Sequence, residues 1–334
     1  MISAKIPIAL LPVFIFLVCL VLLDSFKLIN LFRIVTAILA GMAAALLAFV
    51  VNRWALGNFP ISFDLYSRLA APFIEELLKA LFIVYLLYRN RIGFLVDSTI
   101  LGFSVGAGFA AVENIYYLTV YPDSNLLMWI IRGLGTAVMH GGSTAAFAIL
   151  LKLGVDRKPK QRRFIWLGAA LVPVFLHWLF NSQIKFPMLT TIVQLTVLPV
   201  IITFIFVRSE QSLRNWLEVG LDQDVVLLES IAGGQLSDTR IGRYFHELKD
   251  HFPGEIVADM VCYLRIYLEL AVRAKGLLLL REAGFPAVVD AEIRDKFQEL
   301  DYLSTSIGKT GKLAIKPLFQ NDTRSLWQLY FINQ

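Results

Sequence analysis

Ionisable side chains recur within long apolar stretches of this sequence. The segments APFIEELLK and GFAAVEN carry glutamates, and the segments VMHGGS and FLHWLFN carry one histidine each. A charged residue at the centre of a membrane-spanning helix costs roughly 2.5–3.5 kcal/mol to insert, so such residues usually face the interior of a helix bundle and serve a function. The candidate functional residues are Glu75, Glu76, Glu113, His140, His177 and Asn181.

These residue types together suit the activation of water. A glutamate in a low-dielectric site is a competent general base near neutral pH. Histidine and asparagine donate hydrogen bonds to a developing oxyanion. Peptide hydrolysis needs both functions, so a hydrolytic centre is the first hypothesis.

The spacing of the residues indicates which of their side chains share a helix face. Lys79 lies three residues after Glu76 and four after Glu75, so either carboxylate can pair with its ammonium on one helix face. His177 and Asn181 are four apart and project together. The spacing predicts a constellation built from several helices.

The elements that must position these residues are membrane-spanning helices, which need about 20 mostly apolar residues each. Hydrophobic residues make up 57% of the 334 residues, above the roughly 45–50% of soluble domains. We therefore expect an all-α fold, a polytopic transmembrane helix bundle of about seven helices with a C-terminal helical cytoplasmic domain. The predicted spans are Ile6–Leu23, Leu31–Val51, Arg68–Tyr88, Gly93–Val120, Leu126–Leu153, Phe164–Asn181 and Phe186–Val207.

The charge changes sign along the chain. Residues 1–207 carry a net charge of +8 and residues 208–334 carry −3, which together give the overall +5. The sparsely charged first part suits lipid, and the second part shows the amphipathic spacing of soluble helices. The excess of basic residues comes from loops of the membrane part, so we interpret it as a signal for orientation in a membrane. We expect no nucleic acid partner.

Positive loops face the cytoplasm in most membrane proteins. The segment RKPKQRR (157–163), the pair Arg89 and Arg91, and Lys27 fall in alternate loops, whereas the loop Tyr121–Asn125 has no positive charge. This pattern predicts a multi-pass protein with its N-terminus outside and its C-terminus in the cytoplasm.

The order of these motifs resembles the PrsW family of intramembrane proteases, within the CAAX-prenyl-protease and bacteriocin-processing superfamily. EELLK is followed by FAAVEN, by a histidine in the next helix, and by HWLFN one helix later. The resemblance covers about residues 68–207. Together with the change in charge along the chain, it predicts a transmembrane protease domain over residues 1–207, and residues 208–334, about which the resemblance says nothing, are expected to be an added cytoplasmic helical domain. The resemblance implies a bacterial inner membrane as the setting. It also implies a membrane-anchored protein substrate, such as an anti-sigma factor, cut near the outer face.

The resemblance also implies the site. The family's paired glutamates fall on Glu75 and Glu76, its second motif on Glu113, and its histidines on His140 and His177, with Asn181 after the last histidine. On this hypothesis Glu75 or Glu76 activates water with His140, His177 and Asn181 stabilise the oxyanion, and Glu113 orients or shares protons.

The sequence leaves alternatives open both for the cofactor and for the class of function. Metal-free glutamate and histidine catalysis is the favoured interpretation, with no cofactor required. Zn²⁺ is the alternative, because two histidines and a carboxylate commonly bind it in hydrolases; its ligands would come from Glu76, Glu113, His140 and His177. A proton-coupled transporter or channel, or a non-enzymatic sensor that signals through residues 208–334, would also use buried ionisable groups.

Overall fold

The computed structural model describes residues 2–158, 161–182, 187–285 and 291–319. All regular secondary structure within these ranges is helical, which confirms the expected fold class. The chain divides into two compact units, Met1–Glu210 (unit 1) and Gln211–Gln334 (unit 2), and we describe each by itself.

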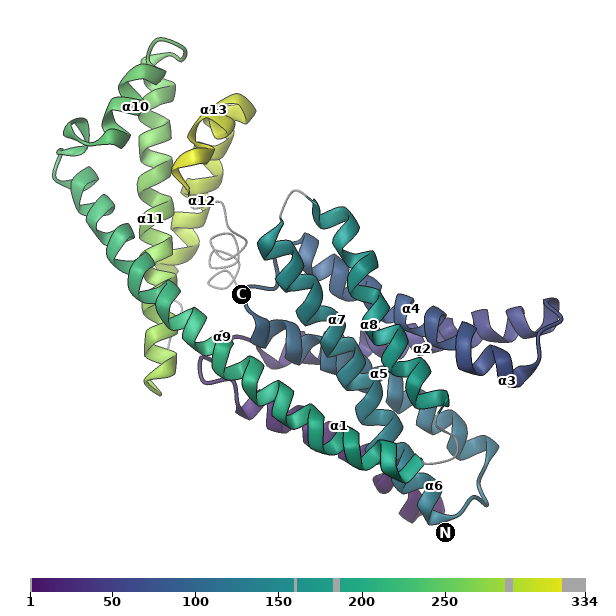
Figure 1. Ribbon diagram of the computed structural model, residues 1–334. Helices are drawn as coiled ribbons and strands as arrows, with labels where there is room; N and C mark the ends of the chain where they lie inside the picture. The colour runs from purple at the N-terminus through teal and green to yellow at the C-terminus, as the bar shows by residue number, and fades with distance from the viewer. Residues whose placement is uncertain (1, 159–160, 183–186, 286–290, 320–334) are drawn as a thin grey trace. The chain divides into compact units, whose positions relative to one another are not determined.

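Unit 1 contains long helices joined by short loops, drawn from purple to teal in Figure 1. Two of them are preceded by π-helical turns, η1 (Tyr66–Ala70) before α4 and η2 (Ile131–Thr136) before α7. The short helices α3 (Phe63–Leu65) and α6 (Leu126–Ile130) precede those turns. The long helices are α1 (Ile2–Leu22), α2 (Leu31–Asn58), α4 (Ala71–Tyr88), α5 (Leu95–Val120), α7 (Ala137–Arg157), α8 (Arg162–Ser182) and the first part of α9 (Pro187–Ala232), whose residues from Gln211 on belong to unit 2.

Six helices in the described part of the chain are long and apolar enough to cross a membrane, namely α1, α2, α5, the continuous α6–α7 segment, α8 and α9. The third predicted span corresponds to α4, which is not among these six because it carries Glu75, Glu76 and Lys79. It nevertheless packs within unit 1, against α2 and α8. The predicted start of the last span, Phe186, lies outside the described residues, and α9 continues well beyond its predicted end at Val207.

Helix α5 forms the centre of unit 1. It is buried along most of its length, and it packs chiefly on α7 and α2. Gly106 permits the contact with α7, because a Cβ atom there would overlap the carbonyl oxygen of His140. Small residues let membrane helices approach this closely, and here the close approach sets the position of the His140 backbone.

Polar contacts connect helices to loops distant in the sequence at both ends of unit 1. At one end, Lys5 Nζ donates to the carbonyl oxygens of Pro122 and Ser124, at 2.6 and 2.9 Å, which ties the start of α1 to the α5–α6 loop. At the opposite end, the Arg33 guanidinium donates to the carbonyl oxygen of Arg91, which ties the start of α2 to the loop before α5. The candidate residues lie toward the first end, which we call the site end.

Unit 2 is a helical unit built on α11 (Gly254–Glu282), against which α10 (Arg240–Leu248), α12 (Ala291–Ser306) and α13 (Gly308–Ile315) pack. Two further short elements are η4 (Leu236–Asp238) and η5 (Lys316–Leu318). Its apolar core consists of Phe245, Leu248, Val257, Met260, Leu264, Leu268, Ile307 and Ile315.

Candidate functional site

Four helices bring their ionisable side chains together near the site end of unit 1. Helix α4 contributes Glu75 and Glu76, α5 contributes Glu113, α7 contributes His140 and α8 contributes His177. Glu113 lies about 10 Å from the end of α5 at 1.5 Å per residue. The constellation expected from the sequence therefore exists as a cluster.

Glu76 occupies the most enclosed position of the cluster. It is fully buried, and its Oε1 accepts from Lys79 Nζ at 2.6 Å, His177 Nδ1 at 2.9 Å and Ser143 Oγ at 3.2 Å. A buried carboxylate needs such partners because desolvation is costly. Glu76 consequently holds Lys79 and His177 in place, and neither of the pockets described below includes it.

His140 connects the Lys79 ammonium to Glu113. Its Nδ1 lies 3.0 Å from Lys79 Nζ, and its Nε2 lies 3.0 Å from Glu113 Oε2. Because an ammonium only donates, Nδ1 accepts and the ring proton resides on Nε2, from which it is donated to Glu113. The Phe109 ring packs against His140 with centroids 5.0 Å apart and lies 4.7 Å from Lys79 Nζ, so Phe109 has a packing role.

Arg132, in η2, is a member of the site that the sequence analysis did not include. Its guanidinium lies 3.1 Å from Glu113 Oε2, donates through Nε to Asn114 Oδ1 at 3.0 Å, and stacks 3.8 Å from the Tyr117 ring centroid. In a regular helix Arg132 and His140 would lie about 80° apart at 100° per residue. The π-helical turn between them absorbs one extra residue and reduces this angle to about 20°, so both reach Glu113.

Glu75 is held from the side of α2. Its Oε1 accepts from Asn52 Nδ2 at 3.2 Å, and Asn52 Oδ1 accepts in turn from Tyr66 OH at 2.9 Å. Its Oε2 lies 3.9 Å from His177 Nε2. Glu75 thus lies on the opposite side of His177 from Glu76.

Asn181 lies at the edge of the cluster. Its Nδ2 donates to the carbonyl oxygen of Ser67 at 3.1 Å, which joins α8 to η1. It lines the same pocket as His177, as their spacing of four residues predicts.

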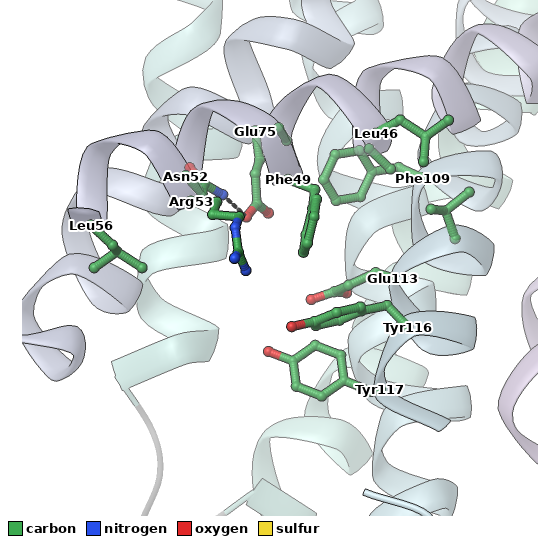
Figure 2. Close-up of a pocket in the computed structure, with 13 residues that line it drawn as sticks. Leu46, Phe49, Asn52, Arg53, Leu56, Glu75, Phe109, Glu113, Tyr116 and Tyr117 are labelled. Carbon is green, nitrogen blue, oxygen red and sulfur yellow. Dashed lines mark hydrogen bonds between the residues drawn. The ribbon is translucent and has the colours of Figure 1, made fainter. Parts of the chain in front are cut away.

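Two pockets adjoin the cluster. The first, which we call the α2–α5 pocket, has a volume of about 560 Å³ and reaches Glu75 and Glu113; Figure 2 shows both carboxylates directed into it. The second, the α6–α8 pocket, has a volume of about 610 Å³ and reaches Glu113 and His177. Glu113 and Tyr117 line both pockets, so the cluster is accessible from two sides.

Glu75, His140 and His177 form a group suited to a metal ion, since one ligand atom from each lies within 4.8 Å of the other two. Two histidines and a carboxylate are a usual zinc set in hydrolases. The second ring nitrogen of His177 is held by Glu76, as supporting carboxylates hold zinc-binding histidines. To bind an ion through Nε2, His140 would have to give up its hydrogen bond to Glu113 and carry its ring proton on Nδ1, where Lys79 Nζ would then have to be neutral and accept it. The carboxylate of this group is Glu75 rather than the Glu76 expected from the sequence.

These features define a polytopic α-helical membrane protein with a cluster of carboxylates and histidines inside its helix bundle. A family model for the PrsW family of intramembrane metalloproteases matches residues 28–208. The chain therefore belongs to that family, and membership implies peptidase activity in a membrane. No curated protein and no solved structure matches the chain.

Proposed function

We propose that this protein is an intramembrane endopeptidase whose centre consists of Glu75, Glu113, His140 and His177, with Glu76 and Asn181 in supporting roles. The observation that carries the proposal is the convergence of these side chains from four helices beside two pockets. The substrate class is a protein anchored in the membrane, of which an anti-sigma factor is one example.

Glu113 is the general base in this proposal. It lines both pockets, and its contacts to His140 and Arg132 both use Oε2, which leaves Oε1 for a water molecule. Arg132 holds the carboxylate in one orientation, and His140 also donates to it as long as no ion is bound to His140. A positioned base of this kind contributes about 10²–10⁴-fold to rate.

Asn181 acts on the carbonyl side, whereas His177, whose Nδ1 donates to Glu76, presents an unprotonated Nε2 that suits a metal ion and not the oxyanion role expected from the sequence. Asn181 uses one amide hydrogen on Ser67, which leaves the other for the oxyanion of the substrate. Glu76 keeps the His177 ring oriented through Nδ1, so that Nε2 faces the pocket and Glu75.

Zn²⁺ is the cofactor we now favour, in place of the metal-free catalysis expected from the sequence. The family description and the Glu75–His140–His177 group support it. When bound there, the ion supplies Lewis-acid chemistry at the scissile carbonyl.

The proposed setting is a bacterial cell membrane, with the cluster near the outer face. Arg89, Arg91, Arg157 and Lys158 belong to loops at the end of unit 1 opposite the cluster, and positive loops are cytoplasmic. On this orientation residues 208–334 form a cytoplasmic domain.

The test is cleavage of a panel of single-pass membrane peptides by the purified protein in detergent. We expect Glu113→Gln and His177→Ala to lower the cleavage rate at least 100-fold. Asp123→Asn, an exposed acid-to-amide change at the site end, is the matched control and should retain wild-type activity. Full activity in Glu113→Gln would contradict the assigned base.

Metal content is measured on the same samples by mass spectrometry. Wild type is expected to hold about one zinc per chain, since the described residues contain one such ligand group. Glu75→Ala and His177→Ala should each lose it, and 1,10-phenanthroline should remove both zinc and activity. Cleavage that persists in zinc-free protein would contradict the zinc proposal and support metal-free catalysis by glutamate and histidine.

A further inference from the structure

The two pockets that meet at Glu113 and Tyr117 differ in chemistry. Besides those two residues and Glu75, the α2–α5 pocket is lined largely by aliphatic and aromatic side chains, namely Ala45, Leu46, Ala48, Phe49, Leu56, Phe109, Val112 and Tyr116, with Asn52 and Arg53 as its further polar members. The α6–α8 pocket presents more hydroxyl, amide and charged groups, namely Ser67, Asn125, Arg132, Thr136, His177, Asn181 and Thr190, beside the apolar Phe63, Leu127, Met128, Ile131 and Phe180. The α2–α5 pocket is therefore the better suited of the two to an apolar ligand, and the α6–α8 pocket offers more hydrogen-bonding partners for water.

The α2–α5 pocket also opens where lipid would lie. Leu46, Phe49 and Tyr116 are 59%, 44% and 43% exposed, and they belong to helices long and apolar enough to cross a membrane. An exposed apolar face in the middle of such helices contacts the bilayer. A segment that is already in the bilayer can consequently reach the pocket without passing through water.

The floor of this pocket is made by small residues. Ala45 and Ala48 are buried against Phe109 and Val112, and this leaves space beside Glu75. Figure 2 shows Leu46, Phe49 and Tyr116 around that space, with Glu75 and Glu113 directed into it. A bulky apolar side chain placed there would bring its own backbone next to both carboxylates.

We infer that the membrane-spanning segment of the substrate docks at the α2–α5 pocket with a large apolar side chain, while water reaches Glu113 from the α6–α8 pocket. The inference rests on the proposed function and adds the route of the substrate and its side-chain preference. Continuity of the α2–α5 pocket with Glu75 and Glu113 argues for a substrate segment as its occupant rather than a structural lipid.

Docking is tested by disulfide cross-linking, which does not need turnover. The probe is a single-pass peptide with a leucine-rich segment and one cysteine scanned along it. The protein carries Glu113→Gln together with Cys19→Ser and Cys262→Ser. Single cysteines are placed at Phe49 in the α2–α5 pocket, at Met128 in the α6–α8 pocket, and at Leu39, which is 58% exposed elsewhere on α2.

We expect cross-links at Phe49→Cys at least five times more abundant than at Met128→Cys or Leu39→Cys. Preferential cross-linking at Met128→Cys would overturn the inference, because the substrate would then occupy the α6–α8 pocket. Equal or absent cross-linking at all three positions would also overturn it.

Side-chain preference is tested with a substrate series that carries Ala, Leu or Phe beside the scissile bond. Ala48→Leu fills the pocket floor, and Leu46→Trp fills its exposed rim without disturbing buried packing. We expect kcat/KM for the Phe substrate to fall at least tenfold in both variants, with the Ala substrate changed less than twofold. Val50→Leu, which is 63% exposed and outside the pocket, is the control.

An equal loss for all three substrates would contradict the preference. If the wild type cut no peptide, the proposed function would fail, and the cross-linking pattern would still decide whether a membrane segment docks at this pocket.

Discussion

At the scale of single residues, the cluster holds three glutamates with two cations and two histidines. Lys79 pairs with Glu76, and Arg132 pairs with Glu113. Among the described residues, the ion-pair contact recorded for Glu75 is His177 at 3.9 Å. Glu75 is therefore the carboxylate with the weakest charge compensation, which is the property expected of a group that receives a cation.

The Lys79–Glu76 pair is expected to be essential for stability. Lys79→Met leaves the Glu76 carboxylate buried without its cation, which costs about 3–5 kcal/mol. The double variant Glu76→Gln/Lys79→Met removes both charges and should recover most of the lost melting temperature in detergent, while remaining inactive. If the double variant melted as low as Lys79→Met, the two residues would not be coupled.

Asp24, in the loop between α1 and α2, makes the stability of the folded protein depend on pH. Burial raises the pKa of Asp24 to about 7, the neighbouring Asp97 adds to this rise, and the Leu28 N–H, 2.7 Å from Oδ2, opposes it. Between about pH 4 and 7 the folded state keeps a proton that the unfolded state has lost, so stability falls as pH rises, by roughly 4 kcal/mol at most.

The check is the melting temperature at pH 5 and pH 8. The wild type should melt lower at pH 8, and Asp24→Asn should reduce this difference because it has no carboxyl proton to lose. An unchanged difference in Asp24→Asn would assign the pH dependence to other groups.

At the scale of helices, sequence alone predicted most of the spans and the candidate carboxylates and histidines. Long apolar runs and buried charges are strong signals because the bilayer penalises exceptions to them. The role of Arg132 could not be predicted, since its place depends on a π-helical turn that periodicity does not show. The distinction between Glu75 and Glu76 also needed the structure, because adjacent residues point about 100° apart and either could pair with Lys79. A possible signal for Arg132 was an arginine inside an apolar stretch that already contained His140.

The contact of α5 with α7 is expected to control activity. In Gly106→Ala the new Cβ meets the carbonyl oxygen of His140, so the helices must separate and the hydrogen bond between His140 and Glu113 must lengthen. We expect a loss of about 1–3 kcal/mol in stability from overpacking and at least a tenfold loss of cleavage. Gly168→Ala in α8, where a Cβ meets no atom within 4 Å, is the matched control and should behave as wild type.

At the scale of the whole molecule, the alternation of the helices fixes which loops share a side of the membrane. The starts of α1 and α6 lie together at the site end, as the contacts of Lys5 with the α5–α6 loop show. The starts of α2 and α5 lie together at the other end, through Arg33 and the Arg91 carbonyl. Since the basic loops belong to that other end, a single orientation satisfies all of them.

The two native cysteines allow this orientation to be measured. Cys262 is exposed in unit 2, and Cys19 lies on the apolar surface of α1, where a thiol has no water to support its ionisation and reaction. With a membrane-impermeant maleimide we expect no labelling of intact spheroplasts and labelling of Cys262 alone in inside-out vesicles. Ser124→Cys in a Cys262→Ser background should show the reverse pattern, because the α5–α6 loop lies at the site end. Labelling of Cys262 from outside would contradict the predicted orientation and place the candidate cluster near the cytoplasmic face.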